Sequence, residues 1–291
     1  MSMKFLDPKN DVAFKKIFGD KHHKNLTINF LNNVLNLTGP KAIKDVTFHE
    51  TAKLPDRIKG KKIYFDVYCI DYGNNHYIIE MQSLNEYNFV ERSEFYLARA
   101  LMSQLDTGKD YQTLLPVIFV GIVNFSLFDE LETDTTHQPE VISHYSMRND
   151  ETCKPLKKSR LALHYIELPK FHKTLDQLET LTDKWFYFLK HANTLDAVPA
   201  PLNDLQEAFN VLDALQWNDA DLQDYSIEQE TIDRERRQQE GSYQEGMQEG
   251  AHNKAVETAI NALKNGLDIA LIAQITGLSI EEIEHLKNDQ V

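Results

Sequence analysis

Asp66, Glu80 and Gln82 are the residues of this 291-residue chain whose types and spacing best fit a catalytic metal site. The segment of residues 71–75, Asp-Tyr-Gly-Asn-Asn, is rich in turn-forming residues and is predicted to join two strands in a hairpin. Gly73, at its centre, lies seven residues from both Asp66 and Glu80. Residues equidistant from a tight antiparallel turn face each other, with Cβ atoms about 4.5–5.5 Å apart. Asp66 and Glu80 are therefore predicted to be cross-strand partners.

Two facing carboxylates repel each other unless a positive charge lies between them. A divalent cation would supply that charge, and oxygen ligands of this kind suit Mg²⁺ or Mn²⁺. Gln82 should emerge on the same face as Glu80, opposite Tyr64, because strand side chains alternate. The alternative is a solvent-facing hairpin with ordinary surface charges. The run IIEMQ counts against it, since it places Glu80 beside strongly apolar neighbours.

The elements that position these residues follow from hydrophobic periodicity. Helices are predicted over residues 10–37 and 86–107, the second closed by Gly108 as its C-terminal cap. After Pro169 the pattern turns helical and stays so. Strands are predicted over residues 42–51, 62–70, 76–82, 116–123, 141–147 and 161–168. This order predicts an α/β core followed by a helical C-terminal region.

Two groups of residues near the hairpin could bind a phosphate backbone. In the predicted helix after the hairpin, Arg92 and Tyr96 share one face, whereas Leu97 and Leu101 lie on the other. An ordinary solvated face explains Arg92 and Tyr96 equally well. A second group of basic residues precedes the hairpin and comprises Lys53, Arg57, Lys59, Lys61 and Lys62.

Composition restricts the class of protein. With 42% hydrophobic and 26% charged residues, the chain resembles a globular protein, and no run approaches the roughly 20 apolar residues of a membrane helix. The two cysteines form neither a disulfide framework nor a zinc cluster, and a cytoplasmic location is expected. The net charge of −14 counts against nucleic-acid binding, although a local basic patch could still guide a phosphate backbone.

The C-terminal tail has its own pattern. Glu-Gly pairs at 240/241, 245/246 and 249/250 interrupt a polar run that otherwise favours helix. A fraying, solvated helix or linker is one interpretation, and a stripe of small residues where two helices approach closely is the other. A helical pair follows, with Ser279 and Glu282 as a capping box. The acidic last helix favours a packing or protein-contact element over a DNA-binding helix-turn-helix.

The motif order along the chain resembles that of a known family. DPKNDVAFKKIFGD, then FDV and IIEMQ, then ERSEFYLARALMSQLDTGKDYQTLLPVIFVGIV, and finally the Glu- and Gly-rich tail are similar to the recombination-promoting nuclease and putative transposase family. That family belongs to the PD-(D/E)XK nuclease superfamily, whose D…(D/E)-x-K signature has Gln82 in the lysine position here. A lysine at that position would add a positive charge that glutamine lacks.

The resemblance implies a PD-(D/E)XK, restriction-endonuclease-like core with a mixed sheet flanked by helices, and Mg²⁺- or Mn²⁺-dependent cleavage of DNA. It implies that Asp66 and Glu80 bind the metal and that Gln82 helps to place the attacking water. Asp11 matches an acidic position on the first helix and could add a further metal ligand, although a favourable charge near a helix N-terminus explains it as well.

These observations lead to one prediction and one alternative. We expect a metal-dependent DNA endonuclease acting through Asp66, Glu80 and Gln82. Arg92, Tyr96, Lys59, Lys61 and Lys62 are the expected substrate contacts. The predicted division is a nuclease-like core over residues 1–170, a helical extension over 171–225 and the tail over 226–291, through which the chain could form a homo-oligomer. No membrane contact is expected. The alternative is a catalytically weak or inactive nuclease fold that serves as an oligomeric interaction module.

Overall fold

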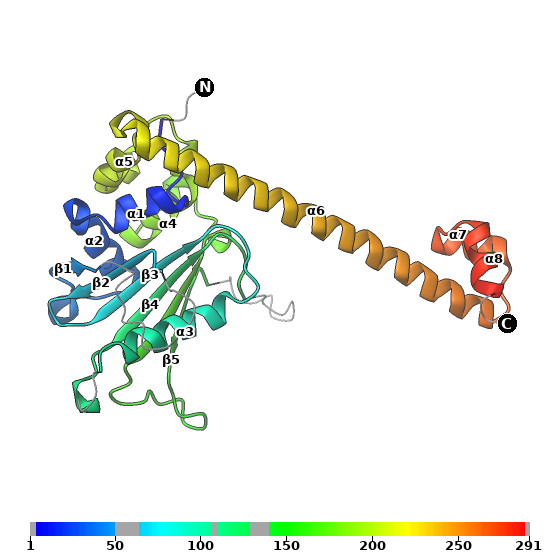
Figure 1. Ribbon diagram of the computed structural model, residues 1–291, viewed down its shortest axis with the longest axis horizontal. Helices are drawn as coiled ribbons and strands as arrows, with labels where there is room; N and C mark the ends of the chain where they lie inside the picture. The colour runs from blue at the N-terminus through cyan, green and yellow to red at the C-terminus, as the bar shows by residue number, and fades with distance from the viewer. Residues whose placement is uncertain (1–3, 50–63, 106–109, 129–139, 289–291) are drawn as a thin grey trace. The chain divides into compact units, whose positions relative to one another are not determined.

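A computed structural model describes residues 4–49, 64–105, 110–128 and 140–288 of the chain. The chain divides into two compact units, Met1–Ile232 and Asp233–Val291. Helix α6, Asp219–Lys264, begins in the first unit and continues into the second (Figure 1). No helix in the described ranges combines the length and apolar character needed to cross a bilayer.

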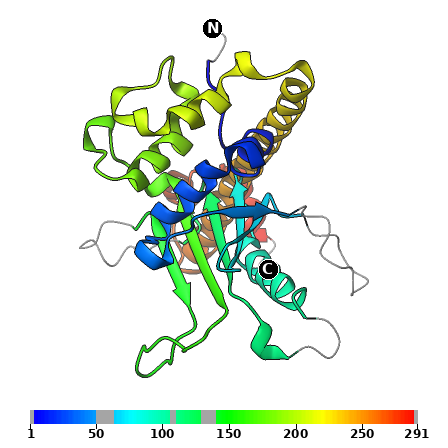
Figure 2. The same ribbon diagram turned by 90° about the vertical axis from the view of Figure 1, so that its left-hand side faces the viewer.

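The first unit is built on a six-stranded mixed sheet with the strand order β1-β2-β3-β4-β6-β5 (Figures 1 and 2). β1, β2 and β3 are antiparallel, β3, β4 and β6 are parallel, and β5 is antiparallel to β6. The strands are β1 Val46–Phe48, β2 Val67–Asp71, β3 His76–Gln82, β4 Val117–Val123, β5 Ile142–Ser146 and β6 Leu161–Glu167. The predicted strands all have a counterpart, and the mixed sheet is confirmed.

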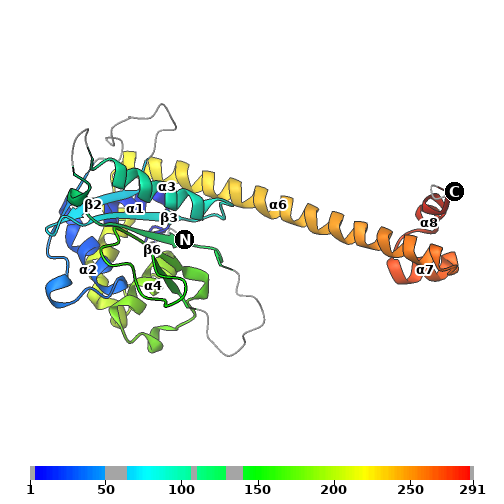
Figure 3. The same ribbon diagram turned by 90° about the horizontal axis from the view of Figure 1, so that it is seen from below.

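Helices cover both faces of the sheet (Figure 3). On one face, Cys69, Ile79 and Ile122 join the larger core with the helices α1, α2, α4 and α5. On the other face, Ile78 and Phe119 pack in a second core with α3. The α-helices are α1 Asp11–Phe18, α2 Lys24–Val34, α3 Phe89–Met102, α4 Leu181–His191, α5 Gln206–Leu212, α6 Asp219–Lys264, α7 Ile269–Thr276 and α8 Ile280–Asn288. Short 3₁₀ turns are η1 Lys21–His23, η2 Gly39–Lys41, η4 Tyr111–Thr113, η5 Leu168–Lys170, η6 Leu175–Gln177, η7 Ala192–Thr194, η8 Ala200–Leu205 and η9 Ala214–Gln216.

The approach of α3 to the sheet depends on Gly121 in β4. A Cβ atom at this position would lie 3.0 Å from the ring of Phe89 and 2.8 Å from the ring of Phe119. Both distances are shorter than a carbon–carbon contact allows, so a larger residue would push the start of α3 away from the sheet. Gly121 therefore helps to set the position of α3 beside β3.

Several of the predicted elements differ in the structure, among them the strand expected over residues 42–51, which spans only Val46–Phe48. The single helix expected over residues 10–37 is two helices, because Asp20 leaves helical geometry and caps η1 by accepting from the N–H of His22. The strand expected from residue 62 begins at Val67, and residues 62–63 lie outside the described part. The helix expected over residues 86–107 spans Phe89–Met102, and its expected cap, Gly108, also lies outside the described residues.

The Glu- and Gly-rich segment is continuous helix. Gly241, Gly246 and Gly250 lie within the 46 residues of α6. Apart from adjacent residues and the backbone of the same helix within four residues, no atom of the described structure lies within 4 Å of a Cβ built on any of the three. The segment is therefore a solvated helix rather than a break in α6, and close packing at the glycines stays a hypothesis.

Candidate active site

The hairpin formed by β2 and β3 has the register that the turn predicted. Val67 pairs with Ile79, and both lie six residues from Gly73. One residue further out, the backbone N–H of Asp66 donates a hydrogen bond of 3.0 Å to Oε1 of Glu80. Asp66 and Glu80 therefore meet at the open end of the hairpin, as their equal distance from the turn required.

Both carboxyl groups are held away from solvent. The backbone N–H of Met81 donates a 2.8 Å hydrogen bond to Oδ2 of Asp66, whose side chain is 19% exposed, and Glu80 is 5% exposed. Burial, followed by the negative charge of Asp11, raises the pKa of Asp66 to about 7. Burial, followed by the charge of Asp66, raises the pKa of Glu80 well above its usual value. Such raised pKa values indicate a site that is short of positive charge.

Helix α1 brings Asp11 and Lys15 to this pair. Nζ of Lys15 lies 2.6 Å from Oδ2 of Asp11 and 3.8 Å from Oδ1 of Asp66. A side-chain hydrogen bond between Asp11 and Asp66 adds to the raised pKa of Asp66, so the two carboxyl groups are close enough to share a proton. Asp11 thus lies beside Asp66, and its role as a metal ligand stays a prediction.

Residues from the end of β3 to the first half of α3 complete the surroundings of Glu80. Nε2 of Gln82 donates to Oε1 of Glu86 at 3.1 Å, and Oε1 of Gln82 accepts from Nη2 of Arg92 at 2.6 Å. Arg92 also forms an ion pair with Glu86, and its charge lowers the pKa of Glu80. Burial, with a contribution from Glu80, raises the pKa of Tyr96 to about 12. Arg92 and Tyr96 therefore lie beside the carboxylates, and their contact with substrate stays a prediction.

Three predicted substrate contacts cannot be placed, and two residues at the site were not predicted. Lys59, Lys61 and Lys62 lie outside the described residues. Sequence reasoning did not single out Lys15 or Glu86. The spacing of four between Asp11 and Lys15 is that of a helical ion pair and could have indicated Lys15. Glu86 lies in an irregular segment, where no periodic pattern indicates its contacts.

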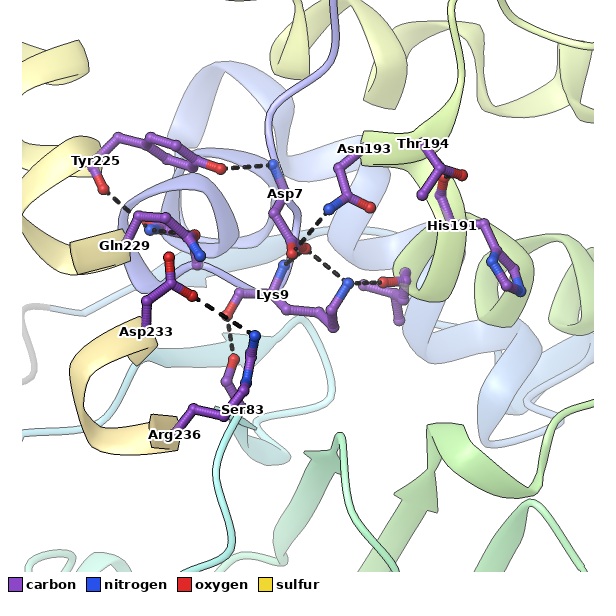
Figure 4. A network of polar contacts seen from close by, with 12 residues as sticks. Asp7, Lys9, Ser83, His191, Asn193, Thr194, Tyr225, Gln229, Asp233 and Arg236 are labelled. Atoms are coloured by element: carbon purple, nitrogen blue, oxygen red, sulfur yellow. Dashed lines mark hydrogen bonds and ion pairs between the residues drawn. The ribbon is translucent and has the colours of Figure 1, made fainter. Parts of the chain in front are cut away.

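A polar network anchors the N-terminal end of α1 (Figure 4). The N–H of Asp7 donates a 2.9 Å hydrogen bond to Oη of Tyr225. Asn10, which caps α1, donates from Nδ2 to the carbonyl of Tyr225 at 3.1 Å. Oγ of Ser83 donates to the carbonyl of Lys9 at 2.7 Å, and Ser83 directly follows β3. The network therefore ties α1 both to β3 and to the first turns of α6.

This anchoring bears on where the tail can be removed. The unit that contains the site extends to Ile232, and Tyr225 belongs to it. A chain ending at Tyr225 would cut α6 within its first two turns, where that helix holds Asn10. A truncation intended to spare the site therefore belongs after Ile232.

The donor chemistry fits a hydrated divalent cation. Mg²⁺ is usually bound by one or two carboxylates, with water molecules completing its shell. Asp66 and Glu80 supply two carboxylates, and their raised pKa values would be relieved by a cation. Within the described ranges, no three His, Cys, Asp or Glu side chains form a ready-made metal-binding group. Two carboxylates are the ligand set of a cation that keeps several of its water molecules.

The second unit ends in two short helices. α7 is followed by Gly277 with φ 74°, the left-handed conformation that allows a sharp turn into α8. The N–H of Ser279 donates to Oε2 of Glu282 at 2.8 Å, and the N–H of Glu282 donates back to Oγ of Ser279 at 3.2 Å. The predicted capping box is therefore present. A small core joins α7 and α8 to the last turns of α6 through Ala259, Ala262, Ile272, Leu278 and Ile283.

Comparison with known proteins identifies both parts of the chain. A family described as "PD-(D/E)XK nuclease family transposase" matches residues 8–240. The "Rpn/YhgA-like nuclease family, C-terminal HTH domain" matches residues 252–288. No curated protein and no solved structure matches the chain.

The second match corrects the interpretation of the C-terminal helices. The sequence argument against a helix-turn-helix rested on the acidic residues of α8. The charge of a helix affects what it contacts. The motif that two helices form depends instead on the turn between them, here at Gly277, and on the apolar residues that pack them together. A nuclease domain and a helix-turn-helix domain in one chain imply binding to DNA.

Proposed function

The chain belongs to the PD-(D/E)XK nuclease family transposases, and on that premise we propose that it is a metal-dependent DNA endonuclease that hydrolyses phosphodiester bonds at Asp66 and Glu80. The observation that carries this proposal is the pair of carboxyl groups at the open end of the hairpin, with Glu80 buried and Asp66 only partly exposed. A protein that used these groups only for structure would have to keep three neighbouring carboxyls, Asp11, Asp66 and Glu80, beside the single ammonium of Lys15. A cation at this point turns that unfavourable arrangement into a binding site.

Each residue has a separate part in the proposed reaction. Asp66 and Glu80 would hold Mg²⁺ or Mn²⁺, which would supply an activated water and offset charge on the phosphate oxygens. Met81 and the backbone of Asp66 hold the carboxylates in place through N–H donors. Arg92 lies next to Glu80, where a guanidinium can donate two parallel hydrogen bonds to a phosphate group.

Gln82 contributes to the site through its neighbours. Both ends of its amide are occupied, one by Glu86 and the other by Arg92. In this arrangement Gln82 holds Arg92 beside the carboxylates. To place an attacking water, as the resemblance implied, its amide would have to use the one N–H or the one lone pair that these two partners leave unused.

The uncharged Gln82 also favours a second candidate function. Without a lysine at this position the chain could retain the nuclease fold as an interaction module with little or no catalysis. The two candidates differ in a simple experiment. Supercoiled plasmid is incubated with the full-length protein in Mg²⁺, in Mn²⁺ or in EDTA, and the products are separated on agarose.

The endonuclease proposal expects nicked and linear plasmid with either metal, none in EDTA, and none with Asp66→Ala. A folded wild-type protein that binds plasmid but leaves it supercoiled in both metals supports the interaction module. Cleavage that persists in EDTA or in Asp66→Ala would place the reaction elsewhere.

A further inference from the structure

We infer that Lys15 on α1 is a catalytic residue of the proposed nuclease, and that its ammonium group donates to a non-bridging oxygen of the scissile phosphate. This inference rests on the proposed function and assigns the positive charge that Gln82 does not carry. The sequence signature would place that charge on β3. The structure places a lysine at the same pair of carboxylates from a different element.

Gln82 cannot take this role in the observed arrangement. Its side chain is uncharged, and both of its polar atoms are engaged, one with Glu86 at 3.1 Å and the other with Arg92 of α3 at 2.6 Å. One N–H of the amide stays unused, but the amide cannot turn towards a phosphate oxygen without breaking one of these hydrogen bonds, and it carries no charge.

Arg92 is the second cation near the carboxylates, and its charge is already balanced. Its guanidinium forms an ion pair with Glu86, donates to Gln82 and lies over the rings of Phe89 at 5.2 Å and Tyr96 at 5.9 Å. These contacts hold it in one orientation. Arg92 can therefore bind a phosphate that comes to it, whereas it cannot move towards the carboxylate pair without leaving several partners.

Lys15 has the reach and the exposure that the role requires. Its Nζ lies 2.6 Å from Asp11 and 3.8 Å from Asp66, and its side chain is 42% exposed. Lys15 and Asp11 line an open groove of about 940 Å³ between α1 and β1, so a ligand in this groove meets the ammonium directly. An ammonium has three donors, and the contact with Asp11 uses one. The others remain able to meet a phosphate oxygen.

The local charges balance only when Lys15 is counted. Asp11, Asp66 and Glu80 bring three negative charges to the site when they are ionised. A divalent cation and Lys15 together bring three positive charges, while Arg92 and Glu86 neutralise each other. With Asp66 engaged by a metal, Lys15 stays next to Asp11 and faces the substrate phosphate that the site must neutralise.

The next residue on α1 provides a matched control. Nζ of Lys16 lies 2.7 Å from Asp221 and 4.8 Å from the ring centre of Trp217, so its ion pair is with Asp221 and not with Asp66, although it lines the same groove as Lys15. Lys15→Met and Lys16→Met remove the same charge from neighbouring positions with similar exposure, 42% and 32%. Only the first change affects the carboxylate pair.

The test combines two measurements on the full-length protein. Single-turnover cleavage of a short DNA duplex in Mg²⁺ should slow by about 10²–10³-fold in Lys15→Met, the cost of removing one donor to a developing charge. Lys15→Arg should recover part of the rate, and Lys16→Met should match the wild type. Calorimetric titration with Mn²⁺ alone should show affinity unchanged or tighter by up to about fivefold in Lys15→Met, because a partly exposed competing ion pair is lost.

The outcomes separate this inference from the proposed function. A wild-type protein that cleaves neither in Mg²⁺ nor in Mn²⁺ refutes both the proposed function and the role of Lys15. Wild-type cleavage that Lys15→Met retains overturns the inference alone. A parallel loss of cleavage and Mn²⁺ affinity in Lys15→Met also overturns it, since Lys15 would then only position Asp11 for metal binding. A rate loss with Mn²⁺ affinity preserved supports it.

Discussion

Replacing Asp66 by asparagine is expected to stabilise the metal-free protein, and the gain should increase with pH. Burial and the neighbouring Asp11 raise the pKa of Asp66 from 3.8 to about 7. A carboxyl with a raised folded-state pKa contributes its full stability below the unfolded-state pKa and loses it as the pH rises through the folded-state pKa. Asparagine has the shape of the protonated acid and does not titrate. The variant therefore avoids this loss.

The size of the effect follows from the pKa difference. One unit corresponds to about 1.4 kcal/mol, so a shift of about three units costs the wild-type protein about 4 kcal/mol at pH 8. Of this, about 3 kcal/mol falls between pH 5 and pH 8. Above about pH 7 the difference between variant and wild type should level off, because Asp66 is then ionised in both the folded and the unfolded state.

Urea unfolding in EDTA, followed by tryptophan fluorescence at pH 5, 6, 7 and 8, measures this difference. Both tryptophans of the chain, Trp185 and Trp217, lie in the unit Met1–Ile232 and report its unfolding. Glu94→Gln, which removes an exposed carboxylate from α3, is the control and should show no such trend. If Asp66→Asn differs from the wild type by the same amount at pH 5 and pH 8, Asp66 does not lie in a charge-poor site and the reasoning fails.

Three further predictions concern the metal, the tail and the basic segment. In thermal melts at pH 8, Mg²⁺ should raise the Tm of the wild type. Glu80→Gln should lose most of that increase in Tm, because one of the two carboxylate ligands is gone. An equal increase in both proteins would contradict the role of Glu80 as a ligand. A chain ending at Glu240, beyond the anchored turns of α6, should keep plasmid cleavage and should lose any oligomer that light scattering detects for the full-length chain. If the truncated chain folds but does not cleave, the tail takes part in catalysis. Replacing Lys59, Lys61 and Lys62 together by alanine should weaken DNA binding and reduce the slope of log affinity against log salt concentration by up to about three. An unchanged slope would show that this segment does not contact the DNA.

The hairpin was predictable because its determinants are local in the sequence. A five-residue turn fixes the centre at Gly73, and strand alternation then determines which residues face each other, so Asp66 and Glu80 could be paired without any tertiary information. A fully apolar run such as that of β4 is typical of a strand covered on both faces, and the structure places β4 between β3 and β6.

The missed features depend on contacts that no local pattern contains. Lys15 meets Asp66 across 51 positions of sequence, and Asn10 meets Tyr225 across 215. The break between α1 and α2 was not predicted because apolar residues recur at helical spacing on both sides of it. Asp20 ends the first segment by capping η1, and a capping aspartate is easily overlooked within an otherwise periodic stretch.

The most direct test of the central claim is the metal-dependent cleavage of supercoiled plasmid by matched, folded variants. Wild type, Asp66→Asn, Glu80→Gln and the control Glu94→Gln are purified identically and compared at equal concentration in Mg²⁺, Mn²⁺ and EDTA. We expect nicking by wild type and Glu94→Gln in either metal, and none in EDTA or by the two site variants. Equal cleavage by Asp66→Asn or Glu80→Gln, or a wild type that leaves the plasmid intact in both metals, would contradict a metal-dependent nuclease site at this pair of carboxylates.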